Sequence, residues 1–313
     1  MDRTTMGSSP YRPLKKIGEG SFGNVWKAVN IHTGQVVAVK ILKDMDGFYD
    51  MKNNPEINAL RLLKGHPNII KLEQDFVHCG SLCLAFEYMN SSLLDVIKDR
   101  RTSGIPFSES EIRHVCSQLL KGLDYMHSRN VMHRDLKPAN ILVSGDHNNY
   151  VKIADLGSAA SLSPSTAEYT DYVTTRWYRS PEQLLGDVHY GSKVDMWAVG
   201  AIMAEMYLLK PLLPGNNKSD QLQHICRVIE TPLSPFLSLS DSIPAAGDSA
   251  MQLMESLLSW DPAMRPTARE ALKHAFFSSK PRPSTSSSYS SYWSSPCAQF
   301  TAPLPPILQA FQV

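Results

Sequence analysis

The hydrophobic pattern of this 313-residue chain changes near residue 107. From Tyr11 to about Leu84, short runs rich in β-forming residues alternate with turn signals, as in GNVWKAVN, HTG and QVVAVKIL. Beyond residue 107 the apolar residues recur at helical spacing, and SESEIRHVCSQLLKGLDYMHSRN predicts an amphipathic helix entered through a serine-rich cap. A β-rich part followed by a helical part predicts an α+β fold of two lobes with a cleft between them.

Charge and cysteine content limit the partners and the compartment. Lys and Arg number 31 and Asp and Glu number 30, so the formal net charge of +1 creates no global attraction to nucleic acid or to an anionic membrane. The five cysteines show no pair at zinc-ligand spacing, which is typical of reduced thiols. The apolar run at 196–213 contains Glu205 and Lys210 and predicts a buried helix instead of a membrane span. We therefore expect a monomer in the cytoplasm or nucleus, with neither nucleic acid nor membrane as a partner.

The stretch GEGSFGNV, residues 18–25, contains glycines at G-x-G-x-x-G spacing. Gly18, Gly20 and Gly23 would let a strand–turn–strand backbone approach phosphates where a side chain would collide. A dinucleotide-binding turn has the same spacing, but it opens a helix. Since the residues from Val25 onward alternate like a strand, the pattern favours a hairpin that covers phosphates.

Lys40 ends the next predicted strand, in the sequence VAVK. Most such lysines are simply solvated, but here the ammonium could reach the α and β phosphates of a nucleotide under the glycine loop. It would need a carboxylate to hold it, and Glu56 in the candidate helix PEINALRLL is the best placed by chain order. Pro55 suits the first turn of a helix, so we expect this helix to begin there and to be short.

The sequence HRDLKPAN, residues 133–140, follows the amphipathic helix. Asp135 could accept a hydroxyl proton, Lys137 could offset the charge of a transferred phosphoryl group, and Asn140 offers a carbonyl to a metal. Asp155, in DLG after the strand YVKIAD, would supply the second hard oxygen ligand that Mg²⁺ prefers. Any one of these motifs could be a capped turn, but all four in this order predict a phosphoryl-transfer site.

Together these motifs resemble those of eukaryotic protein kinases over residues 11–277, and DLKPAN is similar to the Ser/Thr-kinase form. Further similarities are SPE at 180–182, KVDMWAVG with Asp195, and DPAMRPTA with Arg265. The resemblance implies a bilobal protein kinase fold that uses ATP and Mg²⁺, and a buried ion pair between Glu182 and Arg265. The expected boundaries are a disordered N-terminus at 1–10, a β-rich N-lobe at 11–88, a C-lobe at 89–277, and a disordered Ser/Pro-rich tail at 278–313.

The resemblance also implies roles for individual residues. The adenine would lie between Val25 and Ala38 on one side and Leu142 on the other, against the hinge from Glu87 to Met89. The implied nucleotide contacts are Ile17, Gly18, Glu19, Gly20, Ser21, Phe22, Gly23, Val25, Ala38, Lys40, Phe86, Glu87, Met89 and Leu142. The implied catalytic residues are Lys40, Glu56, Asp135, Lys137, Asn140 and Thr175, with Asn140 and Asp155 as the metal ligands.

The stretch TRWYRSPEQLL resembles the kinase group that contains cyclin-dependent kinases, MAP kinases and male-germ-cell-associated kinases. In that group the arginine matching Arg179 helps to form a pocket for a proline after the phosphorylated residue, so protein substrates with Ser/Thr-Pro sites are implied, in signalling or cell-cycle control. A helix that starts at Pro55 lacks the long face that binds cyclin, which argues against a cyclin partner.

The resemblance identifies residues 167–182 as an activation segment open to an upstream kinase. A phosphate on Thr170 or Tyr172 would need arginines to order the segment. Arg176 and Arg179 match the positions that engage phosphotyrosine in MAP kinases. A phosphate on Thr170 would find only Arg134, because Pro55 and Ala160 stand where other arginines are usual. Our hypothesis is that activity depends only weakly on phosphorylation of Thr170.

The chain is short where relatives carry a longer segment, around residues 234–249. Either the lineage trimmed this loop, or the gene model or splice form lost an exon. A rival function is therefore a kinase-like scaffold that binds partners with little or no phosphotransfer. The presence of both Asp135 and Asp155 favours the enzyme, since a scaffold has no need of a base and a metal ligand together.

Overall fold

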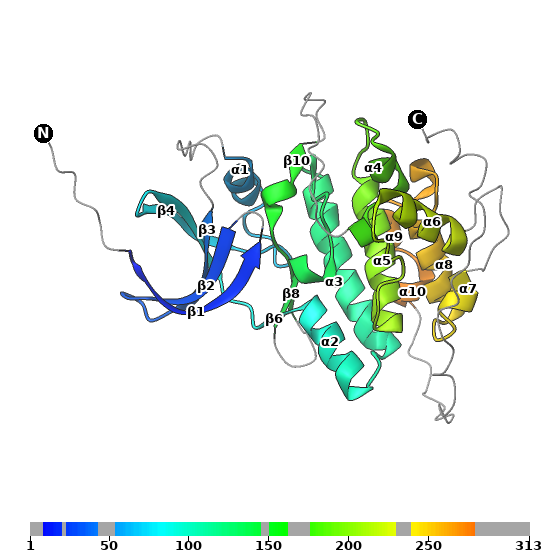
Figure 1. Cartoon of the computed structure of the whole chain (residues 1–313), viewed down its shortest axis with the longest axis horizontal. Coiled ribbons are helices and arrows are strands. Elements are labelled where there is room, and N and C mark those ends of the chain that lie inside the picture. The colour runs from blue at the N-terminus through cyan, green and yellow to red at the C-terminus, as the bar shows by residue number, and fades with distance from the viewer. Residues whose placement is uncertain are drawn as a thin grey trace, which may run out of the picture.

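The computed structural model describes residues 9–20, 23–42, 54–144, 150–161, 176–229 and 239–278. A β-sheet lobe, coloured blue and cyan in Figure 1, is followed along the chain by a larger helical lobe. The arrangement confirms the α+β, bilobal fold that the change of hydrophobic pattern predicts.

A five-stranded antiparallel sheet forms the N-lobe, with strand order β1-β2-β3-β5-β4. Val25 pairs with Lys40, and Ala38 pairs with Phe86, so these four side chains share one face of the sheet. The opposite face carries a small separate core that includes Tyr11, Val37 and Cys83. The strands are β1 (Tyr11–Gly20), β2 (Gly23–Asn30), β3 (Val36–Leu42), β4 (Leu72–His78) and β5 (Ser81–Glu87). Because β2 is a strand where a dinucleotide-binding turn would open a helix, the dinucleotide alternative is wrong.

Helix α1 (Pro55–Leu62) is the helix predicted to begin at Pro55, and its eight residues confirm that it is short. The side chain of Asn54 accepts a hydrogen bond from the backbone amide of Ile57, which caps the first turn. Ile57 and Leu60 are buried in the main core, so the helix packs one face inward and places Glu56 within its first turn.

The C-lobe is built around helices α3 and α5. The predicted amphipathic helix is α3 (Glu109–His127), which begins with a capping box between Ser108 and Glu111. Almost every residue of α5 (Lys193–Leu208) is buried, as predicted for the apolar run, and no helix in the described ranges could span a bilayer. The other helices are α2 (Leu93–Ser103), α4 (Pro181–Leu185), α6 (Lys218–Val228), α7 (Leu239–Ser242), α8 (Asp248–Leu257), α9 (Ala268–Ala271) and α10 (Ala275–Ser278).

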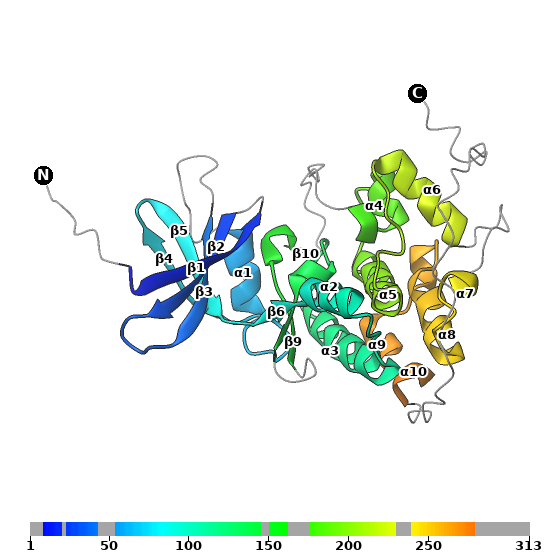
Figure 2. The same cartoon turned by 60° about the horizontal axis from the view of Figure 1, so that its bottom comes forward.

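Short strands lie at the boundary between the lobes, where β6, β9 and β10 are labelled in Figure 2. Strands β6 (Ser91–Ser92), β8 (Ile141–Ser144) and β9 (Tyr150–Ile153) form one small sheet, and β7 (Val131–Met132) pairs with β10 (Ala160–Ser161). The backbone amide of Ile70 donates to the carbonyl of Ile153, and the amide of Ile153 donates to the carbonyl of Asn68. These bonds attach the segment before β4 to the strand that leads to Asp155.

The sequence predicts a shortened segment around residues 234–249, and its described part, from residue 239 onward, packs against the C-lobe core. Leu239 and Ile243 are 5% and 1% exposed and belong to the main core. Helix α7 contacts α8, and the amide of Ala246 donates to the carbonyl of Ile243. The shortened chain therefore still supplies apolar side chains to the C-lobe at this point, while residues 230–238 lie outside the described ranges.

Candidate active site

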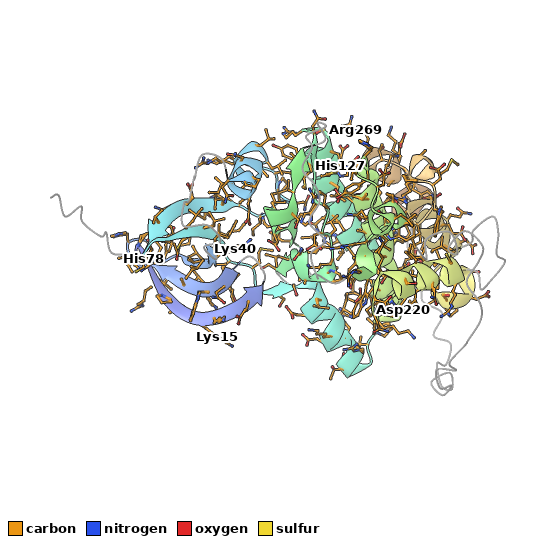
Figure 3. The ribbon with its side chains drawn as sticks, turned by 45° about the horizontal axis from the view of Figure 1, so that its top comes forward. Lys15, Lys40, His78, His127, Asp220 and Arg269 are labelled. Atoms are coloured by element: carbon orange, nitrogen blue, oxygen red, sulfur yellow. The ribbon has the colours of Figure 1, made fainter. Side chains whose placement is uncertain are left out.

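Lys40, which is labelled in Figure 3, lies at the centre of a three-residue charge cluster that joins the lobes. Its Nζ donates to Glu56 Oε1 at 2.7 Å and Oε2 at 3.0 Å, and to Asp155 Oδ1 at 2.9 Å. The side chains of Lys40 and Glu56 are only 10% and 6% exposed. The structure thus brings together the lysine and the carboxylate that the sequence pairs, and adds the predicted metal ligand to the same ammonium.

Burial and charge act in opposite directions in this cluster. Burial disfavours the ammonium of Lys40, yet the carboxylates of Glu56 and Asp155 outweigh it and raise the pKa of Lys40. Burial likewise opposes ionisation of Asp155, yet the charge and hydrogen bond of Lys40 lower the pKa of that carboxyl below its ordinary value. Asp155 is therefore a carboxylate across the neutral pH range, as a ligand of a hard cation must be.

Asp155 itself has a left-handed backbone, with φ 60° and ψ 68°. Such a conformation is uncommon outside glycine and is typical of functional sites. Leu156, which stands where kinases usually have Phe, is 1% exposed and packs in the main core behind Asp155. The apolar packing that the DLG sequence requires is therefore present with leucine.

The catalytic residues predicted from HRDLKPAN converge on Asp135. Lys137 Nζ donates to Asp135 Oδ2 at 2.6 Å, and Asn140 Nδ2 donates to the backbone carbonyl of Asp135 at 2.9 Å. Lys137 and Asn140 come together because Pro138–Asn140 forms a 3-10 turn. The arrangement places a carboxylate, an ammonium and an amide within one loop.

Asp195, from the buried helix α5, holds this loop by its backbone. Its carboxylate accepts from the amides of His133 and Arg134, each at 2.9 Å, and lies 2.9 Å from His127 Nε2. Burial alone would raise the pKa of Asp195, but hydrogen bonding and charge from His127, with help from His133, lower it. The sequence marks Asp195 only as part of a motif, and its contacts explain why a carboxylate is required there.

The metal ligands can be tested against what magnesium requires. The Asn140 amide commits its Nδ2 to Asp135, which leaves Oδ1 as the atom able to bind a cation. No cluster of three or more His, Cys, Asp or Glu side chains in the described ranges could hold a metal. Magnesium fits such a sparse set, because it usually takes one or two carboxylates together with substrate phosphates and water. Asn140 and Asp155 would hold the ion, which supplies neutralisation of phosphate charge when bound.

Most of the residues implied to bind the nucleotide lie within the described ranges of the structure. Val25, Ala38 and Phe86 share the sheet face of Lys40, and Leu142 comes from β8. Met89 packs against the main core. Ile17, Gly18, Glu19 and Gly20 belong to β1, where Ile17 and Glu19 are exposed, whereas Ser21 and Phe22 lie outside the described ranges.

Two of these positions have structural roles that the sequence did not indicate. A Cβ on Gly23 would lie 2.1 Å from the carbonyl oxygen of Ile41, so glycine is required there by the approach of β2 to β3. The side chain of Glu87 accepts from the amide of Lys71 at 2.8 Å and from Lys152 Nζ at 2.9 Å. Glu87 therefore braces the hinge through its side chain.

The regulatory predictions are only partly within reach of the structure. Thr170, Tyr172 and Thr175 lie outside the described ranges. Arg176 begins the 3-10 turn Arg176–Tyr178, and the amide of Arg179 donates to its carbonyl. The dependence on Thr170 and the roles of Arg134, Arg176 and Arg179 stay predictions.

The pair implied between Glu182 and Arg265 is present. Arg265 Nη1 and Nη2 donate to the two carboxylate oxygens of Glu182 at 2.6 and 2.9 Å, and Arg265 is fully buried. Sequence reasoning missed other residues nearby. Tyr178 donates to the buried carboxylate of Glu205 at 2.6 Å, and Gln183 contacts the catalytic loop at Arg134. The S-x-x-Q spacing of SPEQ, a capping-box signature, was an available signal for Gln183.

The two-lobed fold and the charge cluster of Lys40, Glu56 and Asp155 are the arrangement that a protein kinase domain requires. The chain matches the protein kinase domain family over residues 11–277, and it belongs to that family. It is 43% identical over 290 residues to cyclin-dependent kinase F-3 of Oryza sativa subsp. japonica. This match covers 85% of the present chain and 65% of the rice protein. The chain is 40% identical over 288 residues to serine/threonine-protein kinase MAK of Homo sapiens. This match covers 85% of the present chain and 45% of the human protein. The chain thus spans only part of the length of these relatives.

Proposed function

We propose that this chain is an ATP-dependent protein serine/threonine kinase, which transfers the γ-phosphoryl group of Mg-ATP to Ser or Thr hydroxyls followed by proline. The observation that carries the proposal is the double ion pair of Lys40, whose Nζ contacts Glu56 and Asp155 at 2.7 and 2.9 Å. A lysine in this position holds phosphates only when a carboxylate orients it, and here both partners are in place within one chain.

The residues of the catalytic loop have separate tasks in this proposal. Asp135 accepts the proton of the acceptor hydroxyl or orients its oxygen toward the phosphorus atom. Lys137, 2.6 Å from Asp135, offsets negative charge on the phosphoryl group as it passes. Lys40 holds the α and β phosphates, and Asn140 and Asp155 hold the magnesium ion.

The choice of acceptor rests on two stretches of sequence. Lys137 within DLKPAN supports a Ser/Thr hydroxyl, and the human relative is named a serine/threonine-protein kinase. TRWYRSPEQLL, with Arg179, supports a pocket for proline after the acceptor. Trp177 Nε1 donates to the carbonyl of Gly215 at 3.0 Å, a bond that helps to fix this segment on the C-lobe.

A cyclin partner is not part of the proposal, although one relative is named a cyclin-dependent kinase. Helix α1 is short, and Glu56 already contacts Lys40 in the single chain. We also propose that an upstream kinase phosphorylates the 167–182 segment. The proposed location is the cytoplasm or the nucleus.

The test is phosphate transfer from labelled ATP, in the presence of Mg²⁺, to a peptide with one Ser-Pro site. We expect incorporation with the wild-type chain and none above background with Asp155→Ala. A matched peptide with Ser-Ala should be a markedly poorer substrate. Incorporation that is equal with Asp155→Ala would contradict the kinase, and equal use of both peptides would contradict the preference for proline.

A further inference from the structure

Gln183 lies in the first turn of α4 and contacts two different loops. Its Oε1 accepts from the backbone amide of Ser180 at 3.1 Å and from the Ser180 hydroxyl at 3.2 Å. Its Nε2 donates to the backbone carbonyl of Arg134 at 3.3 Å. One side-chain amide therefore joins the segment that carries Arg179 and Ser180 to the residue that precedes Asp135.

The carbonyl that Gln183 binds belongs to an unusual peptide. Arg134 has a left-handed backbone with φ 72°, which costs free energy for a residue other than glycine and persists only where neighbouring groups impose it. Its amide donates to Asp195 at 2.9 Å, and its carbonyl accepts from Gln183. Side chains from α5 and α4 thus hold the amide and the carbonyl of the residue that precedes Asp135.

A plain capping role does not account for the choice of glutamine. In the described part of the chain, four helices begin with a side chain that accepts from the N-cap amide in this way, and the other three use a carboxylate. These are Asp95 on Ser92, Glu111 on Ser108, and Glu270 on Thr267. A cap needs only an acceptor, so the donor that distinguishes Gln183 is not required by the helix. That donor is the atom that reaches Arg134.

We propose that Gln183 is a positioning residue for Asp135, and that it couples the substrate-side segment at Ser180 to the catalytic loop. The inference rests on the proposed kinase activity. Without the donor, the Arg134 carbonyl loses its hydrogen bond to Gln183, and the peptide leading to Asp135 gains freedom. Gln183 is only partly buried, and Glu and Met have side chains of similar length, so conservative variants should fold.

Two variants separate the donor from the cap. Gln183→Glu keeps an acceptor for Ser180 and loses the donor, while Gln183→Met loses both without adding charge. We expect each to lower kcat by about tenfold, because a small misplacement of the base is costly, while KM for ATP changes by less than about twofold. The melting temperature should fall for both variants, and further for Gln183→Met, because that variant loses the cap as well as the donor. The matched control is Glu270→Met, which removes the equivalent cap of α9; it should lower the melting temperature and leave kcat unchanged.

Amide hydrogen exchange of residues 133–140 gives a readout that does not need activity. We expect faster exchange in both Gln183 variants and no change in Glu270→Met. If the wild-type chain transferred no phosphate, the proposed function would fail, and exchange would still decide the role of Gln183. Wild-type kcat and wild-type exchange in Gln183→Glu would overturn the proposal, because Gln183 would then be a cap only.

Discussion

Asp195 is fully buried, yet its charge is the anchor of the catalytic loop. Its carboxylate accepts from the backbone amides of His133 and Arg134 and contacts His127. These partners lower its pKa against the effect of burial. The carboxylate can remain ionised only while the loop supplies donors, and the loop keeps its left-handed turn at Arg134 only while the carboxylate accepts them.

We predict that Asp195→Asn lowers the free energy of unfolding by about 3 kcal/mol near neutral pH, because an amide cannot accept all of these bonds. The effect should depend on pH with a definite sign. Since the pKa of Asp195 is lower in the folded protein than its value of about 3.9 in an unfolded chain, its stabilisation is complete above that value and is lost as pH falls through the lowered pKa. Urea unfolding from about pH 7 down to pH 3 measures this, and a difference between the two proteins that did not shrink in acid would contradict it.

At the scale of elements, α1 depends on its first turn. A helix of eight residues is marginal by itself, so its N-cap and its packing decide whether the turn that carries Glu56 is formed. Asn54 caps the amide of Ile57 at 3.0 Å, and Pro55 occupies the position where proline is best tolerated. Burial raises the pKa of Glu56, and the Lys40 ammonium together with the positive end of the helix dipole opposes that effect.

We predict that Asn54→Ala destabilises α1 by about 1 kcal/mol and weakens the Lys40–Glu56 pair, while Asn54→Asp and Asn54→Ser retain most of the wild-type behaviour. The measurements are the melting temperature and KM for ATP. The melting temperature should be close to wild type for Asn54→Asp and Asn54→Ser and lowest for Asn54→Ala. KM for ATP should be highest for Asn54→Ala. If Asn54→Ser and Asn54→Ala were equally impaired, the cap would not be what positions Glu56.

The predictions from sequence succeeded where one local motif contains all the groups that must meet. One stretch of six residues contains Asp135, Lys137 and Asn140. The start of α1 is likewise indicated locally, by Pro55. The predictions missed roles that arise between distant segments where no motif marks the partners, whereas the Glu182–Arg265 pair was implied by the family resemblance. Gln183 and Arg134 are 49 residues apart, and the need for Gly23 follows from the carbonyl of Ile41 on the adjacent strand. Side-chain reach and steric contact across segments cannot be read from a single stretch of sequence.

At the scale of the whole molecule, the lobes meet at several fixed points. Asn68 donates to Gln118 and to the carbonyl of Val151, and Lys152 pairs with Glu87 at the hinge. A Cβ on Gly122 of α3 would lie 3.0 Å from the carbonyl oxygen of Asn68, so this helix approaches the N-lobe segment closely. Lys40 and Asp155 extend the same connection into the site, and a nucleotide bound there would contact both lobes.

We therefore predict that Mg-ATP stabilises the entire fold and not one lobe. At a concentration of about 100 times its dissociation constant, a ligand that binds only the folded state adds about 2.7 kcal/mol to the free energy of unfolding. The melting temperature should rise by several degrees with Mg-ATP in a single transition. Asp155→Ala should lose most of this rise, while Arg269→Ala, which breaks an exposed ion pair with Asp124, should retain it. A rise of equal size in Asp155→Ala would show that Asp155 does not hold the magnesium nucleotide, and two separate transitions would show that the lobes unfold independently.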